Sequence, residues 1–225
     1  MAAPSTILLI HGFASSFEHG WRQTGWVDIL GDFGVEAPAI DLPGHGAWAP
    51  LPDPNDFTDV PEKLFRSLPD RPPYSAVGFS IGAQQLLRMA ISHPGAFERI
   101  VLMGLGDSIF DSASTTTIVD ALKAPDEPED VQQRLFRRLA ATTGSDVPSL
   151  INFLERSRPA ITDELLSHVT CPVLVLIGER DEATPKRLVA GLPNATLVVL
   201  PGVDHFSTPQ DFGAIDATMR FFDLG

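Results

Sequence analysis

The chain contains very little cysteine, and few basic residues relative to acidic ones. Cys171 is the single cysteine among 225 residues, so no disulfide can form within the chain and the fold does not need an oxidising compartment. Sixteen Lys and Arg residues stand against 29 Asp and Glu residues, and the net charge of −13 repels phosphate backbones and anionic membrane surfaces. Neither a nucleic acid nor a membrane is therefore an expected partner.

Long hydrophobic runs and metal-binding patterns are also absent. The apolar run from Ile7 to Ile10 is far too short for a signal peptide or a membrane span, and residues 1–6 carry no positive side chain. Together with the lone cysteine, this predicts a cytoplasmic protein. No group of Cys and His residues has the spacing of metal ligands, so neither a metal nor an organic cofactor is expected. No long heptad pattern indicates an oligomeric state.

The sequence does contain the pattern of one α/β domain. Its length and its 44% hydrophobic content suffice for a single hydrophobic core. Continuous apolar runs, typical of strands buried on both faces of a parallel sheet, occur at Ile7 to Ile10, Ala76 to Phe79, Ile100 to Met103, Val173 to Ile177 and Leu197 to Leu200. A weaker run near Val35 to Ile40 brings the expected number of strands to about six. Amphipathic stretches such as Ile81 to Ser92 alternate with these runs, which predicts a mostly parallel sheet flanked by helices.

The alternation of strands and helices is interrupted between residues 107 and 167. This interval has no convincing strand pattern, only helical ones. Val131, Leu135 and Leu139 follow one another at a spacing of four residues, which predicts a surface helix whose apolar stripe lies on something apolar. We therefore expect a helical insertion in the α/β domain.

The motif Gly78-Phe79-Ser80-Ile81-Gly82 is the clearest chemical signal in the chain. It lies between a strand pattern and a helix pattern, where a G-x-S-x-G sequence forms a tight turn that presents its serine alone. Glycine at both outer positions removes side chains that would crowd this turn. The backbone N–H of Ile81 then has no helical acceptor and can face a charge that develops beside Ser80. We therefore expect Ser80 to be a nucleophile.

A serine nucleophile needs a histidine base and a carboxylate that orients it. His205 follows the last strand pattern, at the end of a parallel strand where a base is expected, whereas the other five histidines have structural or solvated interpretations. For the carboxylate, the residues leave several candidates open. Glu179, Asp181 and Glu182 directly follow one strand pattern, and Asp107 follows another.

These motifs and their order resemble the α/β-hydrolase superfamily, in which the nucleophile precedes the acid and the acid precedes the histidine. The resemblance implies Asp181 as the acid, with Ser80 and His205. His11-Gly12-Phe13-Ala14 resembles the family's H-G-x motif and implies that the backbone N–H of Phe13 joins that of Ile81 in an oxyanion hole. Asp41-Leu42-Pro43-Gly44-His45-Gly46 resembles a structural turn of the same family.

The resemblance also implies a division of the chain. Residues 1–106 and 168–225 are expected to form the α/β-hydrolase core, and residues 107–167 a short helical cap. Aromatic residues that could line an apolar substrate pocket are Phe79, Trp48, Phe110 and Phe153, although aromatic residues more often belong to a core.

The expected activity is hydrolysis of a carboxylic ester with a small or medium apolar acyl group, through an acyl-enzyme on Ser80. Fold and triad are shared by several activities, so two alternatives stay open. One is a thioesterase or a carbon–carbon bond hydrolase. The other is a ligand-binding receptor that retains the triad.

Overall fold

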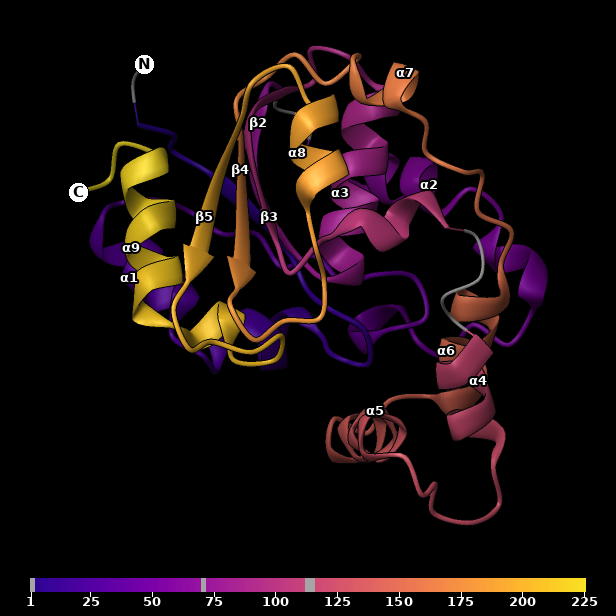
Figure 1. The fold of residues 1–225 in the computed structure, drawn as a ribbon. Coiled ribbons are helices and arrows are strands. Elements are labelled where there is room, and N and C mark those ends of the chain that lie inside the picture. Colours follow the sequence, from indigo (N-terminus) through magenta and orange to yellow (C-terminus); the bar gives the residue numbers. More distant parts are fainter. Residues whose placement is uncertain (1–2, 70–71, 112–115) are drawn as a thin grey trace.

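The computed structural model describes residues 3–69, 72–111 and 116–225 and contains a parallel five-stranded sheet. The strands lie side by side in chain order (Figure 1) and are β1 (Ile7–Ile10), β2 (Tyr74–Phe79), β3 (Phe97–Met103), β4 (Val173–Gly178) and β5 (Ala195–Leu200). All five predicted strands are present, and three of them begin two or three residues earlier than the sequence indicated. Because the strands are parallel, their carboxyl ends meet at one edge of the sheet.

The sheet expected to have about six strands has five, because the segment near residues 35–40 does not form a strand. A single parallel bridge joins Glu36 to Thr6 beside β1, and the ladder stops there. Pro38 follows two residues later and has no N–H to donate to a neighbouring strand. The prediction of a sixth strand was therefore wrong.

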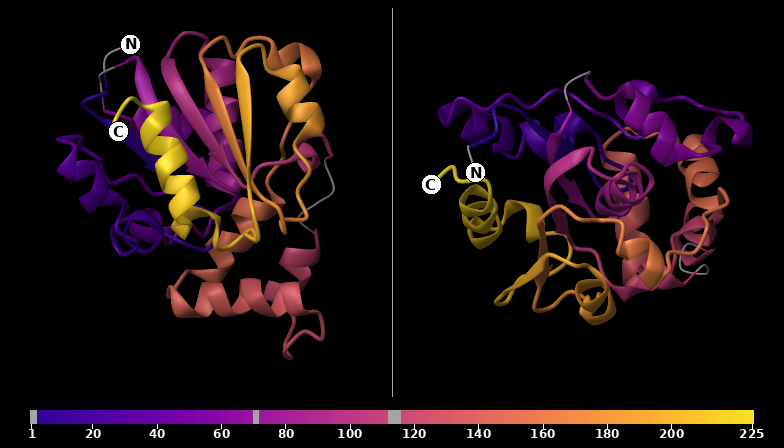
Figure 2. Two further views of the ribbon diagram at one scale, coloured as in Figure 1. Left: turned by 60° about the vertical axis from the view of Figure 1, so that its left-hand side comes forward. Right: turned by 90° about the horizontal axis from the view of Figure 1, so that it is seen from above.

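Helices cover both faces of the sheet (Figures 1 and 2). The helices are α1 (Trp26–Asp32), α2 (Val60–Ser67), α3 (Ile81–Ser92), α4 (Thr116–Lys123), α5 (Val131–Thr142), α6 (Val147–Glu155), α7 (Asp163–Leu166), α8 (Lys186–Gly191) and α9 (Phe212–Phe221). Helices α1 and α9 lie on one face, and α2, α3 and α8 lie on the other. The α/β architecture predicted from the sequence is confirmed.

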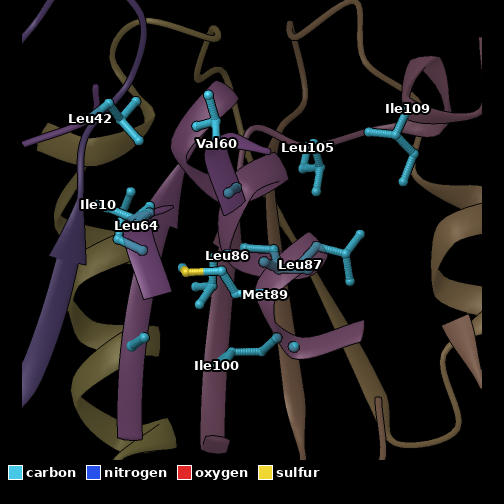
Figure 3. Packing of buried hydrophobic residues seen from close by; sticks show 14 of the residues in the cluster. Ile10, Leu42, Val60, Leu64, Leu86, Leu87, Met89, Ile100, Leu105 and Ile109 are labelled. Carbon is cyan, nitrogen blue, oxygen red and sulfur yellow. The ribbon is translucent and has the colours of Figure 1, made fainter. Parts of the chain in front are cut away.

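Alternate residues of each strand enter two separate hydrophobic clusters. On β1, Leu8 and Ile10 pack toward the face of α3, whereas Ile7 and Leu9 pack toward the face of α1 and α9. Figure 3 shows Ile10 in the first cluster with apolar side chains of α2 and α3. Burial on both faces explains why the strands have continuous apolar sequences.

Helices α4, α5 and α6 lie beyond the carboxyl ends of the strands (Figures 1 and 2). The N-cap residues of α5 and α6 are aspartates that accept a hydrogen bond from a backbone N–H: Asp130 from Gln133, and Asp146 from Ser149. The apolar stripe of α5 is only partly covered, since Val131 is 70% exposed and Leu135 is 42% exposed. The stripe therefore lies on apolar side chains in part: Leu139 packs against the core cluster, whereas Val131 and Leu135 stay exposed.

Candidate active site

Ser80 occupies a strained turn between β2 and α3. Its backbone has φ 53° and ψ −117°, a region that residues with a side chain rarely adopt and that costs roughly 1–3 kcal/mol. A Cβ atom at Gly82 would lie 2.4 Å from the carbonyl oxygen of Ile10, and one at Gly78 would lie 2.7 Å from Cα of Ala83. The two glycines thus let α3 start directly against β1.

His205 lies in the loop after β5 and reaches both Ser80 and Asp181. Its Nε2 is 3.0 Å from Oγ of Ser80, and its Nδ1 is 2.7 Å from Oδ2 of Asp181. A carboxylate accepts hydrogen bonds, so Nδ1–H donates to Asp181 and Nε2 is left to accept the serine proton. Two hydrogen bonds in series therefore connect the serine hydroxyl to a carboxylate.

Asp181 is held at the end of β4 and is largely shielded from solvent. Its side chain is 4% exposed, and Oδ1 accepts a hydrogen bond of 2.9 Å from the backbone N–H of Ala183. This second bond fixes the carboxylate so that Oδ2 faces His205.

The other acids that the sequence left open serve local structure. Asp107 accepts hydrogen bonds from the N–H groups of Arg187 and Leu188 and so caps α8. Glu179 accepts a hydrogen bond from the N–H of Gly202, and Glu182 is exposed. Of these four acids, Asp181 is the one that contacts His205 within the described chain.

The backbone N–H groups of Phe13, which lines the same cavity as Ser80, and of Ile81, which follows Ser80, have no hydrogen-bond acceptor among the described residues. Ile81 is the first residue of α3, so its N–H has no acceptor within the helix. Phe13 lies in the loop after β1, beside Gly12, whose missing side chain leaves room for the ring of Phe79. The oxyanion hole that the resemblance implies at Phe13 and Ile81 stays a prediction.

His11 and Asp41 hold the loop that carries Phe13. Nδ1 of His11 donates to the carbonyl of Gly12 at 2.8 Å, and its Nε2 accepts from the N–H of Leu42 at 3.1 Å. Burial alone would raise the pKa of Asp41, but the neighbouring side chain of His11 and hydrogen bonds from the backbone N–H groups of Phe17 and Ala47 lower it to about 2. The ionised carboxylate therefore fastens the loop, as the structural interpretation of this turn predicted.

A cavity of about 410 Å³ opens over Ser80 and His205. Phe13 and Phe79 form part of its wall next to the two catalytic candidates. Helix α5 forms another part, through Leu135, Phe136 and Leu139 among others. The apolar stripe of α5 thus faces this cavity in part, and most of the wall surface is apolar.

Phe79 is the one member of the predicted substrate-binding group found in this wall; Trp48, Phe110 and Phe153 lie elsewhere in the described structure. Phe153 is fully buried and packs edge-on against His45 and Phe57 in the core. Phe110 is covered by the guanidinium group of Arg187, 3.9 Å from its ring centroid. Trp48 packs on the same hydrophobic cluster as Phe153.

Sequence reasoning missed the cavity wall contributed by residues 15–24. His19, which we expected to be structural or solvated, is exposed in this wall, and its Nδ1 lies 2.9 Å from Oγ of Ser16. Trp21 also lines the cavity while its Nε1 is buried without a hydrogen-bond partner in the described chain. No strand or helix period marks this segment, so only its place beside the Ser80 turn identifies it.

The described ranges contain no group of three or more His, Cys, Asp or Glu side chains that could hold a metal ion. None of the helices in those ranges is both long and apolar enough to cross a membrane.

Burial raises the pKa of the Cys171 thiol to about 11, so this side chain is a neutral thiol at pH 7.

Comparison with known proteins adds family and fold. Residues 7–215 match the family described as the Alpha/beta hydrolase family. The chain is 27% identical to a pimeloyl-[acyl-carrier protein] methyl ester esterase from Nitrosomonas europaea, over 92% of both chains. It is 23% identical to a 2-hydroxy-6-oxononadienedioate/2-hydroxy-6-oxononatrienedioate hydrolase from Cupriavidus pinatubonensis, over 92% of this chain and 82% of the relative. A hydrolase from Pseudomonas aeruginosa has the same fold, with TM-score 0.73 and 20% identity over 97% of this chain and 89% of that chain.

Proposed function

The chain belongs to the alpha/beta hydrolase family, and we propose that it hydrolyses a carboxylic ester through an acyl-enzyme formed on Ser80. The observation that carries this proposal is the pair of hydrogen bonds from Ser80 to His205 and from His205 to Asp181. A serine hydroxyl is a weak nucleophile at neutral pH, and this arrangement supplies both a base and a group that holds the base.

In the first half of the reaction, Oγ of Ser80 attacks the ester carbonyl while Nε2 of His205 takes the serine proton. Asp181 stays ionised and stabilises the imidazolium that forms. The carbonyl oxygen becomes an oxyanion, which the N–H groups of Phe13 and Ile81 stabilise. Loss of one such donor typically raises the barrier by roughly 2.7–4 kcal/mol. His205 then returns its proton to the leaving alcohol, and the acyl group stays on Ser80.

In the second half, a water molecule attacks the acyl-enzyme and His205 takes a proton from this water. Collapse of the second tetrahedral intermediate returns that proton to Ser80 and releases the carboxylic acid. The same base and the same two backbone donors serve both halves.

The substrate that the cavity favours is an ester with a small or medium apolar acyl group. Apolar side chains from α5 face the cavity opposite Ser80, and a cavity of about 410 Å³ is within the range of small-molecule sites. We further propose that residues 107–167 form a cap that covers the reaction, on a core made of residues 1–106 and 168–225. The wall contributed by α5 supports this division.

The test is hydrolysis of p-nitrophenyl esters of increasing acyl length by the wild-type chain and by Ser80→Ala. We expect turnover by the wild type and its loss, by a factor of 10³ or more, in the variant. Ser75→Ala is the matched control, because Ser75 lies in β2, the strand that leads to Ser80, and has a buried hydroxyl with no described partner. Equal activity of wild type and Ser80→Ala would overturn the proposal.

Carbon–carbon bond hydrolysis is the second candidate, because the relative that is 23% identical is named a 2-hydroxy-6-oxononadienedioate/2-hydroxy-6-oxononatrienedioate hydrolase. A dienoic 2-hydroxy-6-oxo acid distinguishes it, since cleavage removes the conjugated absorbance. If the protein cleaves this acid but does not hydrolyse the p-nitrophenyl esters, carbon–carbon bond hydrolysis is favoured. A folded protein that binds apolar esters but turns over neither class would favour the receptor alternative.

A further inference from the structure

A second cavity, of about 540 Å³, lies on another flank of the molecule. It is bounded by α3, by residues 54–61 at the start of α2, and by residues 156–161 after α6. Figure 1 shows α2 and α3 beside the chain that runs from α6 to α7. None of its wall residues belongs to the wall of the Ser80 cavity.

Three arginines line this cavity: Arg88 from α3, and Arg156 and Arg158 from the segment after α6. Arg158 has an interaction of its own, so Arg88 and Arg156 are the two that matter here. Nε of Arg88 and Nη2 of Arg156 are buried and have no hydrogen-bond partner in the described part of the chain. The guanidinium of Arg156 also stacks on Phe153, 3.7 Å from the ring centroid, and donates to the carbonyl of Phe153. Its orientation is therefore fixed while one of its donors stays unused.

No carboxylate compensates the charges of Arg88 and Arg156 in the described ranges. Asp59 lies in the same wall, but its carboxylate accepts from the N–H of Glu62 and caps α2. Burial, and to a smaller extent repulsion from Arg158 and Arg88, lowers the pKa of Arg156 to about 9. Burial and Arg158 also lower the pKa of Arg88. Both groups keep their charge at pH 7, and an uncompensated buried charge is costly.

The remaining wall suits an organic molecule more than a bare ion. Phe57, Val60, Ile91 and Ile161 provide apolar surface around the arginines. Gln85 is fully buried behind this wall, and its amide oxygen has no hydrogen-bond partner among the described residues. In a chain of net charge −13, a cavity lined by Arg88 and Arg156, which have no carboxylate partner in the described ranges, suits an anion.

We propose that this cavity is a binding site for a small organic anion, whose carboxylate or phosphate group lies between Arg88 and Arg156 and whose apolar part contacts Phe57 and Ile161. Guanidinium groups bind both kinds of oxyanion by charge-assisted hydrogen bonds. The site is separate from the ester chemistry proposed for Ser80, and its occupation does not require turnover.

Calorimetric titration of the full chain with hexanoate, hexyl phosphate, inorganic phosphate and hexan-1-ol tests this site at constant ionic strength. We expect one or both hexyl anions to bind and the neutral alcohol to bind at least tenfold more weakly. The tighter of hexanoate and hexyl phosphate identifies the head group. If inorganic phosphate binds as tightly as both hexyl anions, the proposed contact of the apolar part with Phe57 and Ile161 is contradicted. If no anion binds, the proposed site is overturned.

Three variants locate the bound anion. Arg88→Leu and Arg156→Leu each remove one unused donor, and each should weaken binding about tenfold or more. They lie on different elements, so either variant that keeps the wild-type circular dichroism spectrum is a sufficient test. Arg138→Leu is the matched control, because Arg138 lines the Ser80 cavity and is exposed. Unchanged binding in a folded Arg88→Leu or Arg156→Leu protein, or lost binding in Arg138→Leu, would overturn the proposal.

Discussion

Nε2 of His205 lies 3.0 Å from Oγ of Ser80, although 125 positions separate the two residues in the chain. The strands that precede them, β2 and β5, are not neighbours, since β3 and β4 lie between them. The loop after β5 therefore brings His205 back across the sheet edge, where its ring rests on Gly104. A Cβ atom at position 104 would lie 3.0 Å from Cε1 of this ring. The contact between His205 and Ser80, the proposed base and nucleophile, thus depends on the path of a loop as well as on the strands.

Asp181→Asn should lower kcat on the order of 10³–10⁴-fold with little change in folding. An amide at this position can stabilise the wrong tautomer of His205 and no longer balances the imidazolium. Steady-state kinetics with the best p-nitrophenyl ester measures this change. Asp107→Asn is the control, because it perturbs the cap of α8 and should lower the stability by roughly 1 kcal/mol without a comparable loss of kcat. If Asp107→Asn lowers kcat more than Asp181→Asn does, the assignment of Asp181 as the orienting carboxylate is wrong.

Gly82→Ala should destabilise the protein and lower its activity together. The added Cβ would lie 2.3 Å from the carbonyl oxygen of His11 and 2.4 Å from that of Ile10, so α3 must move away from β1. Thermal unfolding and ester hydrolysis measure the two effects. In Gly31→Ala, by contrast, the new methyl group meets nothing within 4 Å, and stability should be unchanged or raised by up to about 1 kcal/mol.

Leu135→Trp should shift the preference among p-nitrophenyl esters toward shorter acyl chains. Leu135 lies in the cavity wall and is 42% exposed, so a larger side chain can narrow the cavity without crowding the core. The ratio of kcat/KM for two chain lengths measures the shift. Phe153→Leu provides the comparison, because Phe153 is fully buried outside this wall and its loss should lower the melting temperature while leaving the ratio unchanged.

His45→Asn should flatten the acid dependence of stability. Burial lowers the pKa of His45 to about 3, whereas an unfolded histidine has a pKa near 6.5. The unfolded state therefore binds one proton more than the folded state between these values. Stability falls as pH decreases from about 6.5 toward 3, by roughly 1.4 kcal/mol per pH unit for one proton. Urea unfolding at pH 7, 6, 5 and 4 measures this slope.

The control for the histidine experiment is Asp41→Asn, which acts in a lower pH range. The pKa of Asp41 is about 2 in the folded protein, so this carboxylate contributes stability above its unfolded pKa near 4 and loses that contribution as pH falls toward 2. Its replacement should lower stability at pH 7 and leave the slope between pH 6.5 and 5 in place. An unchanged slope in His45→Asn would contradict the assignment.

The sequence by itself determined the strands, the helix after Ser80 and the order of the motifs. These features depend on local patterns: continuous apolar runs for strands buried on both faces, and glycine at positions 78 and 82 where any side chain would collide. The resemblance to the family followed from the order of Ser80, an acid after a later strand, and His205, together with the glycine-rich turns, and this resemblance in turn selected Asp181 as the acid.

Only the tertiary structure decided which distant groups meet. The candidates Asp107, Glu179 and Asp181 all follow strands, and the paths of two loops brought one of them to His205. The same held for the cavity: Phe153 was expected to line it but is buried in the core, whereas Leu135 of α5 faces it. Periodicity tells that a helix has an apolar face, but the packing of the whole chain determines whether that face meets the core or a cavity.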